Sequence, residues 1–320
     1  MTVLDTGRES EKVFAVAFYP DGKHLLGGGD DGIQRWRLSD NQEVGKQTGT
    51  KLRAICVSKD QKWVVCGAFE GASVWDAQIQ EKVIDVEGIN GVRAVDISPE
   101  STRFATGTER GEVSIWGISS GERLVGPLQL DKHTYVAGIK FSPNGEHIAA
   151  ACYGCSIRIF DSHNGDELID INIEIPRVTP ATPLAWSSDG QRIFAASNDK
   201  KVRSFEVSTG SQLAELQLIN SSHVVRSIAL SANGKFIAII VDRSISFLDT
   251  STLSRIGPII EDNTEMRSIA ISQDSSYLAT GRDGGKIDIR PLSKILSDSY
   301  GPFDVCLCAF ILSASPTHLP

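Results

Sequence analysis

The feature that most constrains the fold of this chain is a repeat that runs through most of its 320 residues. In each copy a short alternating strand pattern closes on an apolar residue, and a Ser-Pro or similar pair follows. This anchor recurs at Phe18, Val57, Ile97, Phe141, Trp186, Leu230 and Ile271, at intervals of 39, 40, 44, 45, 44 and 41 residues. Such a period is typical of a repeat unit built from four short strands.

Each repeat then follows the same order of strands and turns. A tight turn comes after the anchor strand, and in four repeats it holds Asp-Gly or Asn-Gly, pairs whose tolerance of positive φ suits a two-residue hairpin loop. These pairs are Asp21-Gly22, Asn144-Gly145, Asp189-Gly190 and Asn233-Gly234. We expect looser polar turns in the other three repeats. The repeats predict an all-β fold, a seven-bladed β-propeller of four-stranded antiparallel blades.

A count of the strands indicates how the ring closes. The seventh repeat, residues 266–292, supplies only three strands, whereas Thr2-Val3-Leu4 precedes the first repeat as an outer strand precedes the later ones. Because closure removes exposed strand edges, we expect this N-terminal strand to complete the last blade. The propeller then spans 1–292, and 293–320 form a C-terminal tail outside the repeat, for which we expect weak order.

The third strand of each repeat carries an aromatic residue followed by an acid, to varying degrees. Trp75-Asp76 and Phe160-Asp161 keep both, Trp36, Trp116 and Phe205 keep the aromatic, Leu248-Asp249 keeps the acid, and Arg290-Pro291 has neither. This pattern resembles the WD40-repeat family over about residues 1–292. The resemblance implies a surface that holds other macromolecules without catalysis.

The sequence departs from that family in its polar tetrad. The acid before the third strand has candidates at Asp30, Asp199 and Asp242, and the histidine that should pair with it has candidates only in His133 and His223. We therefore expect apolar packing to hold most blades. Residues 121–128 and 256–259 also resemble WD40 arrays of NACHT-type signalling proteins, so a sensor module of a larger signalling complex is the alternative function.

Three short motifs would suggest other chemistry if they stood alone. Residues 27–32 have the spacing of a dinucleotide fingerprint, and 117–121 match the G-x-S-x-G of hydrolases, but both motifs need a helix after the turn and here a strand follows. Cys152 and Cys155 have the spacing of half a zinc site, with no second pair at a suitable distance. We predict that the protein is not an enzyme and holds no cofactor or metal.

The composition limits the classes of partner that this protein can bind. The 32 Lys and Arg against 40 Asp and Glu, a net charge of −8, argue against a broad grip on nucleic acid. The polar N-terminus indicates an intracellular protein, cytoplasmic or nuclear, in which the six cysteines are free thiols. The longest apolar run, 305–312, is too short to span a membrane. We expect protein partners, and a monomeric propeller within a complex.

Four arginines form the candidate site. The position four residues before the anchor is Arg53, Arg93, Arg226 and Arg267 in four repeats, and Phe14, Ala137 and Thr182 in the others. Equivalent positions in a ring face a common axis, so these side chains should gather on the top face, the face at which the innermost strands begin. The planar guanidinium suits carboxylate or phosphate.

The placement of these arginines is similar to that of the phosphate-reading arginines in WD40 propellers of F-box proteins. An acidic or phosphorylated peptide is therefore the expected ligand, and Arg226 with Arg267, on adjacent blades, is the expected pair for one anion. Arg53 and Arg93 form the second pair. The alternative is that the arginines are solvated or paired with Asp and Glu of adjacent loops.

Overall fold

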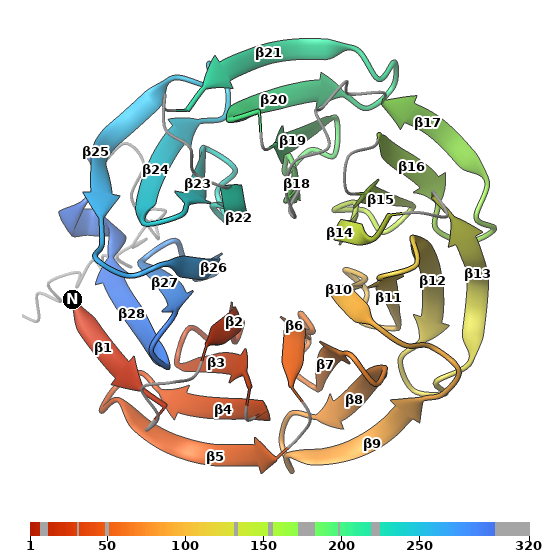
Figure 1. Cartoon of the computed structure of the whole chain (residues 1–320), viewed down its shortest axis with the longest axis horizontal. Coiled ribbons are helices and arrows are strands. Elements are labelled where there is room, and N and C mark those ends of the chain that lie inside the picture. The colour runs from red at the N-terminus through yellow and green to blue at the C-terminus, as the bar shows by residue number, and fades with distance from the viewer. Residues whose placement is uncertain are drawn as a thin grey trace, which may run out of the picture.

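The computed structural model describes residues 1–6, 12–30, 32–48, 51–130, 134–152, 156–171, 183–197, 199–218 and 225–297. Seven four-stranded antiparallel sheets surround a central axis like the blades of a propeller (Figure 1). The predicted fold is confirmed. Within the described residues, no helix is long and apolar enough to cross a membrane.

In six blades the strands follow one another from the axis outward in chain order. Blade 1 contains β2 (Val13–Phe18), β3 (His24–Gly29), β4 (Gly32–Arg37) and β5 (Gln42–Thr48), and blade 2 contains β6 (Leu52–Val57), β7 (Trp63–Ala68), β8 (Ala72–Asp76) and β9 (Glu81–Val86). Blade 3 contains β10 (Val92–Ile97), β11 (Arg103–Thr108), β12 (Glu112–Gly117) and β13 (Arg123–Gln129), and blade 4 contains β14 (Val136–Phe141), β15 (His147–Cys152), β16 (Ile157–Asp161) and β17 (Glu167–Ile171). Blade 5 contains β18 (Leu184–Trp186), β19 (Arg192–Ala196), β20 (Lys201–Glu206) and β21 (Gln212–Gln217), and blade 6 contains β22 (Val225–Leu230), β23 (Phe236–Val241), β24 (Ser244–Asp249) and β25 (Arg255–Glu261).

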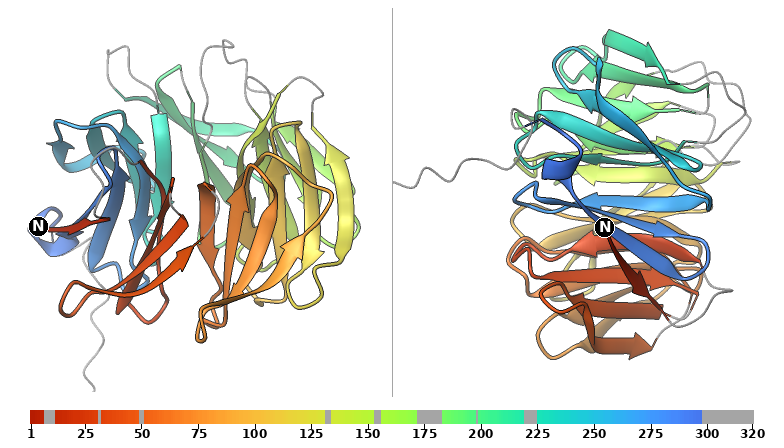
Figure 2. Two further views of the ribbon diagram at one scale, coloured as in Figure 1. Left: turned by 60° about the horizontal axis from the view of Figure 1, so that its bottom comes forward. Right: turned by 90° about the vertical axis from the view of Figure 1, so that its left-hand side faces the viewer.

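Blade 7 joins the two ends of the repeat array. Its inner strands are β26 (Met266–Ile271), β27 (Tyr277–Arg282) and β28 (Lys286–Pro291), and its outer strand is β1 (Thr2–Asp5). The strands β1 and β28 pair in antiparallel register, with Thr2 opposite Ile289. Figure 2 shows the N-terminal strand lying against the C-terminal ones. The prediction that the N-terminal strand closes the ring is confirmed, and a 3-10 turn, η1 (Leu292–Lys294), follows β28.

Every predicted anchor is the last residue of an innermost strand. The turn that follows is the same in all seven blades, because Gln61, Ser101 and Ser275 take positive φ of 64°, 61° and 55° where the other blades have glycine. The N–H group of Ser101 donates to the carbonyl oxygen of Ser98 at 2.8 Å, just as Gly145 donates to Ser142 at 2.9 Å. The expectation of looser turns in three repeats is therefore wrong.

The core lies between blades, where each sheet packs its apolar faces against its neighbours. The fully buried Phe104 of β11 and Trp116 of β12 stack with 6.4 Å between ring centroids, and they share a buried cluster with Val74 of blade 2. The Nε1 group of Trp116 donates to Thr106 Oγ1 at 2.9 Å. This hydrogen bond ties the third strand to the second.

Blade 7 makes the same link with a different residue. Arg290 stands in the place of the aromatic residue, and its Nη1 donates to Thr280 Oγ1 at 3.1 Å. Its Nη2 lies 3.1 Å from the fully buried carboxylate of Asp288 and 3.4 Å from Asp262. The loss of the aromatic-acid pair in this repeat is thus compensated by a buried ionic network.

Candidate functional site

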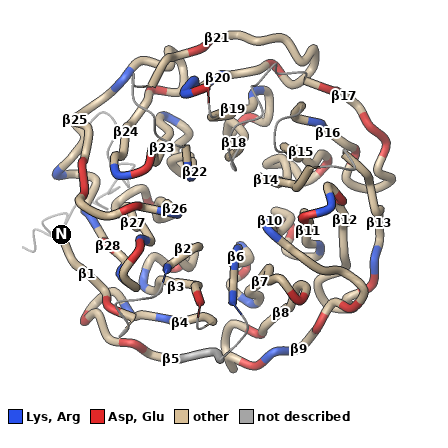
Figure 3. The backbone as a smooth tube through the Cα atoms, in the orientation of Figure 1, with Lys and Arg blue, Asp and Glu red and all other residues tan. Residues whose placement is uncertain are grey.

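The four predicted arginines lie at the beginning of four innermost strands, around the top mouth of the central channel. Each is the second residue of its strand, in β6, β10, β22 and β26. The pairing with the next strand shifts register at each of these positions. A bulge of this kind re-aims the side chain it carries. Figure 3 shows basic and acidic segments side by side around the opening.

Three of the arginines are paired with the acid that directly follows the second strand of their own blade. Arg93 Nε donates to Glu109 Oε1 at 2.9 Å, and its guanidinium lies 4.4 Å from the centroid of the Tyr135 ring. Arg267 Nη2 donates to Asp283 Oδ2 at 2.9 Å. The hydrogen bond from Arg267 holds the pKa of the Asp283 carboxyl below its ordinary value.

The third of these arginines shares a carboxylate with its neighbour. Arg226 Nε lies 3.7 Å from Asp242 Oδ1, and Arg226 Nη2 donates to Glu265 Oε2 at 3.2 Å. Arg267 Nη2 reaches the same Glu265 oxygen at 3.3 Å. Arg226 and Arg267 therefore lie together, as their places in the ring predict, but the anion between them is a side chain of the protein itself.

Arg53 differs from the other three. The acid stands sixteen positions after Arg93 and after Arg267, and the residue sixteen positions after Arg53 is Phe69, whose side chain is 62% exposed. Within the described part of the chain, Arg53 has no carboxylate partner; its guanidinium instead lies 4.9 Å from the centroid of the Phe14 ring. Arg53 thus keeps an unneutralised charge at the channel mouth.

Blade 1 has the opposite arrangement. Phe14 holds the arginine position, and Asp30 holds the acid position and pairs with Lys51, which precedes β6. The ring of Phe14 also lies 5.3 Å from Lys51 Nζ and 5.6 Å from the guanidinium of Arg267. The Phe14 ring therefore lies within cation–π distance of three basic side chains.

The acids and aromatic rings around the arginines are the functional residues that the sequence analysis missed. The constant sixteen-residue offset between the arginine and the acid is the signal that could have found Glu109, Asp242 and Asp283. Of the remaining slots, Ala137 of β14 carries no charge, and Thr182 lies outside the described residues.

The tetrad candidates do not form a tetrad where the structure describes them. Asp30 and Asp242 belong to the top-face network just described. Asp199 accepts a hydrogen bond from Arg203, whose Nη1 also donates to Ser197 Oγ at 2.9 Å. His133 and His223 lie outside the described residues.

The described cysteines are free thiols, as predicted. They are Cys56, Cys66 and Cys152, while Cys155, Cys306 and Cys308 lie outside the described residues, as does the end of the predicted C-terminal tail, 298–320. Burial, with the nearby charge of Asp96, raises the pKa of the Cys56 thiol to about 12. This thiol is not activated as a nucleophile. Among described residues, no group of three or more His, Cys, Asp or Glu side chains could hold a metal ion.

Comparison with known proteins agrees with this architecture. The family model described as "WD domain, G-beta repeat" matches residues 2–36, 127–161 and 184–206. A protein named eukaryotic translation initiation factor 3 subunit I is 24% identical in Emericella nidulans, over 64% of this chain and 63% of that protein. The protein of the same name in Aspergillus terreus is 26% identical, over 74% of this chain and 70% of its own length.

A third relative differs in name and length. Autophagy-related protein 16 of Arabidopsis thaliana is 24% identical over 75% of this chain, and the match spans 48% of the plant protein. The chain thus spans less than two thirds of two of these three relatives. The chain thus carries WD40 repeats at the residues that the family model matches, and it folds as a seven-bladed β-propeller.

Proposed function

We propose that this protein is a non-catalytic scaffold, a single propeller that holds partner proteins within a larger intracellular assembly. Two of the relatives are named as a subunit of a translation initiation factor, which is itself a multi-subunit assembly by that name. The three motifs that could suggest an enzyme lie in ordinary positions of the repeat. The net charge of −8 favours protein over nucleic acid as the partner.

The ligand class of the top face follows from Arg53. Its charge is not neutralised by its own blade, whereas Arg93, Arg226 and Arg267 each face a carboxylate. An acidic or phosphorylated side chain can pair with Arg53 without displacing an internal acid. The exposed Phe69 offers apolar contact to the next residue of such a peptide. The absence of an acid at the Phe69 position is the observation that carries this proposal.

The other arginines contribute less under this proposal. A ligand carboxylate that approaches Arg226 and Arg267 must compete with Glu265, which already accepts from both. A phosphate, with more charge and three acceptor oxygens, competes better than a carboxylate. We therefore place the primary anion contact at Arg53 and a secondary, phosphate-selective contact at the Arg226–Arg267 pair.

Binding to an array of matched peptides tests the proposal. Each sequence carries phosphoserine, glutamate or glutamine at one position, and bound peptides are titrated in solution. Removing one charged hydrogen-bond partner costs roughly 1.5–3 kcal/mol, so Arg53→Ala should weaken acidic peptides about tenfold to a hundredfold. Phe69→Glu, which restores the acid of the other blades, should weaken them similarly by neutralising Arg53.

Lys82→Ala is the matched control, because it removes an exposed cation from the outer strand β9. It should leave peptide affinity unchanged. Equal affinity of wild type and Arg53→Ala for every acidic peptide would reject the anion site. A preference for neutral peptides would reject the acidic ligand class and still leave the scaffold role open to test with other partners.

A further inference from the structure

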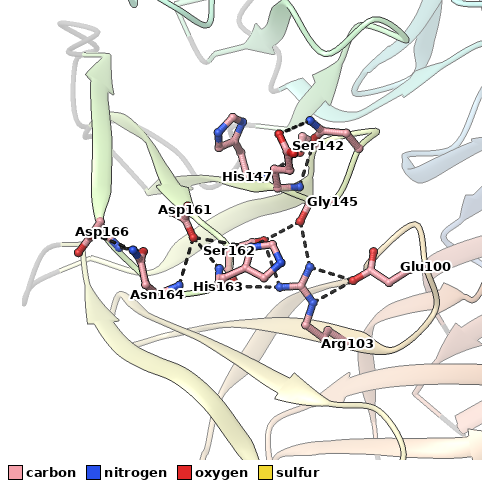
Figure 4. Close-up of polar contacts among 12 residues, drawn as sticks. Glu100, Arg103, Ser142, Gly145, His147, Asp161, Ser162, His163, Asn164 and Asp166 are labelled. Carbon is pink, nitrogen blue, oxygen red and sulfur yellow. Dashed lines mark hydrogen bonds and ion pairs between the residues drawn. The ribbon is translucent and has the colours of Figure 1, made fainter.

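Blades 3 and 4 are joined on the bottom face, where the innermost strands end, by an arginine that reaches from one blade to the next (Figure 4). Arg103, the first residue of β11, donates from Nη1 to the Ser162 carbonyl oxygen at 2.9 Å and from Nη2 to the Gly145 carbonyl oxygen at 3.0 Å. Both acceptors belong to blade 4. Glu100, three residues before the arginine, accepts from its Nε at 2.9 Å. We refer to this arrangement as the interblade clamp.

The interblade clamp recurs between blades 5 and 6. Arg192, the first residue of β19, donates from Nη1 to the Thr250 carbonyl oxygen at 3.0 Å. Thr250 follows β24 as Ser162 follows β16, and each hydroxyl donates to the carbonyl oxygen of the turn glycine at 2.6 Å. At this second junction Arg192 contacts one of the two carbonyl oxygens. Arginine begins the second strand in these two blades, whereas the other five begin it with His24, Trp63, His147, Phe236 or Tyr277.

The junction of blades 7 and 1 has the same backbone frame without the arginine. Tyr277 begins β27, and its N–H donates to Ser272 Oγ at 2.9 Å, as that of Arg103 donates to Ser98 Oγ at 3.1 Å. On the blade 1 side, the N–H of Leu38 donates to the Lys23 carbonyl oxygen at 2.8 Å, as Ser162 does to Glu146.

A groove of about 450 Å³ lies at this junction, lined in part by Gly22, Leu38 and Tyr277 and by the basic residues Lys23, His24 and Arg37. Leu38 has no hydroxyl to replace that of Ser162. Consequently the carbonyl oxygens of Gly22 and Leu38, the equivalents of the two clamp acceptors, receive no hydrogen bond from any described residue. The side chain of Tyr277 is 39% exposed beside them.

We propose that this groove binds an arginine side chain of a partner protein, which supplies from outside the guanidinium that Arg103 and Arg192 supply from within. The planar fork of arginine matches two carbonyl acceptors, which the point charge of lysine does not. The ring of Tyr277 offers a face for stacking. The site lies on the face opposite Arg53 and does not depend on the top-face ligand.

Charged side chains around the groove affect its affinity for an arginine side chain. Asp274 holds the place of Glu100, and the neighbouring cations Arg37 and His24 are paired with Asp40 and Asp21. Lys23, which is exposed, stands where blade 4 has Glu146 and opposes a second cation. Reversing that charge with Lys23→Glu should therefore tighten the binding of arginine.

The test uses N-acetyl-arginine amide as the probe and follows backbone amide resonances by two-dimensional NMR. Arginine amide should shift the resonances of Gly22, Leu38 and Tyr277, and the neutral isostere N-acetyl-citrulline amide should bind about tenfold more weakly. Tyr277→Arg should fill the groove from within and abolish the shifts, with unfolding at the same or a higher urea concentration. Lys23→Glu should increase the affinity several-fold.

Three results would overturn the proposal: equal shifts with arginine and citrulline amides, shifts that persist in folded Tyr277→Arg, or shifts that fall elsewhere on the protein. If Tyr277→Arg fails to fold, Lys23→Glu still tests the proposal. This variant should fold, because it changes an exposed side chain. Unchanged or weaker affinity in Lys23→Glu would equally contradict the assignment.

Discussion

Ring closure is tested most directly by truncating one buried side chain of β1. Leu4 is 3% exposed and packs in a cluster that joins blade 1 to blade 7 through Trp36 and Ile289. Leucine-to-alanine changes at such sites cost about 2–5 kcal/mol, through lost transfer energy and the remaining cavity. Leu4→Ala should therefore lower the free energy of unfolding by about that amount, a large effect for a position so near the end of a chain.

The adjacent Val3 provides the control. Its side chain points to the opposite face of β1 and is 44% exposed, so Val3→Ala should change the free energy by no more than about 0.5 kcal/mol. Urea unfolding followed by tryptophan fluorescence gives both values. Deleting residues 1–4 should cost more than Leu4→Ala, because the pairing with β28 is lost as well. Equal stability of Leu4→Ala and Val3→Ala would refute this account of closure.

Two further predictions concern charged contacts. Arg103→Met should lower the free energy of unfolding in urea by about 1–3 kcal/mol, because the Ser162 and Gly145 carbonyl oxygens lose their guanidinium donor; wild-type stability would show that the interblade clamp contributes nothing. Arg267 lowers the pKa of Asp283 in the folded state. The ionised Asp283 carboxylate therefore adds stability above its unfolded-state pKa of about 3.9, and this stability is lost as the pH falls through the lower, folded-state pKa. Asp283→Asn should thus destabilise the protein at pH 7 and make a shrinking difference in urea titrations as the pH drops toward 3; a difference independent of pH would contradict that origin.

The architecture could be predicted from the sequence because each blade repeats a local pattern. The anchor and the turn recur in phase, so a weak signal in one repeat is supported by the same signal in the others. Closure followed from a count of strands. The turns at Gln61, Ser101 and Ser275 were predicted less well because residue preference was used alone. The two strands they join impose the turn geometry and its positive φ, and the packing of the blade overrides the preference.

The candidate site could be predicted only in part for a related reason. Position in the repeat placed the four arginines around one mouth of the channel. Their partners follow the neighbouring strand, and the arginines themselves lie at bulges whose register no single-strand pattern reveals. Pairing with Asp and Glu of adjacent loops is the alternative that the sequence leaves open for these arginines, and it applies to three of them, through Glu109, Asp242 and Asp283. The exception at Arg53 becomes visible only when blades are compared at the same offset.

A repeat protein supplies its own reference for such comparisons. The same contact recurs in more than one blade. Where a blade keeps the backbone arrangement and lacks one of the two contacting side chains, the other blades show which chemical group would fit the remaining one. Arg53 lacks the acid that Arg93 and Arg267 have, so an outside acid suits it. The carbonyl oxygens of Gly22 and Leu38 lack the guanidinium that blade 4 receives, so an outside arginine suits them. Arg53 belongs to blade 2 and the two carbonyl oxygens belong to blade 1, so the two vacancies lie on adjacent blades and face opposite sides of the disc. A partner of mixed charge that passes around the rim of these two blades would satisfy both at once, which a ring of seven identical blades could not offer at any one place.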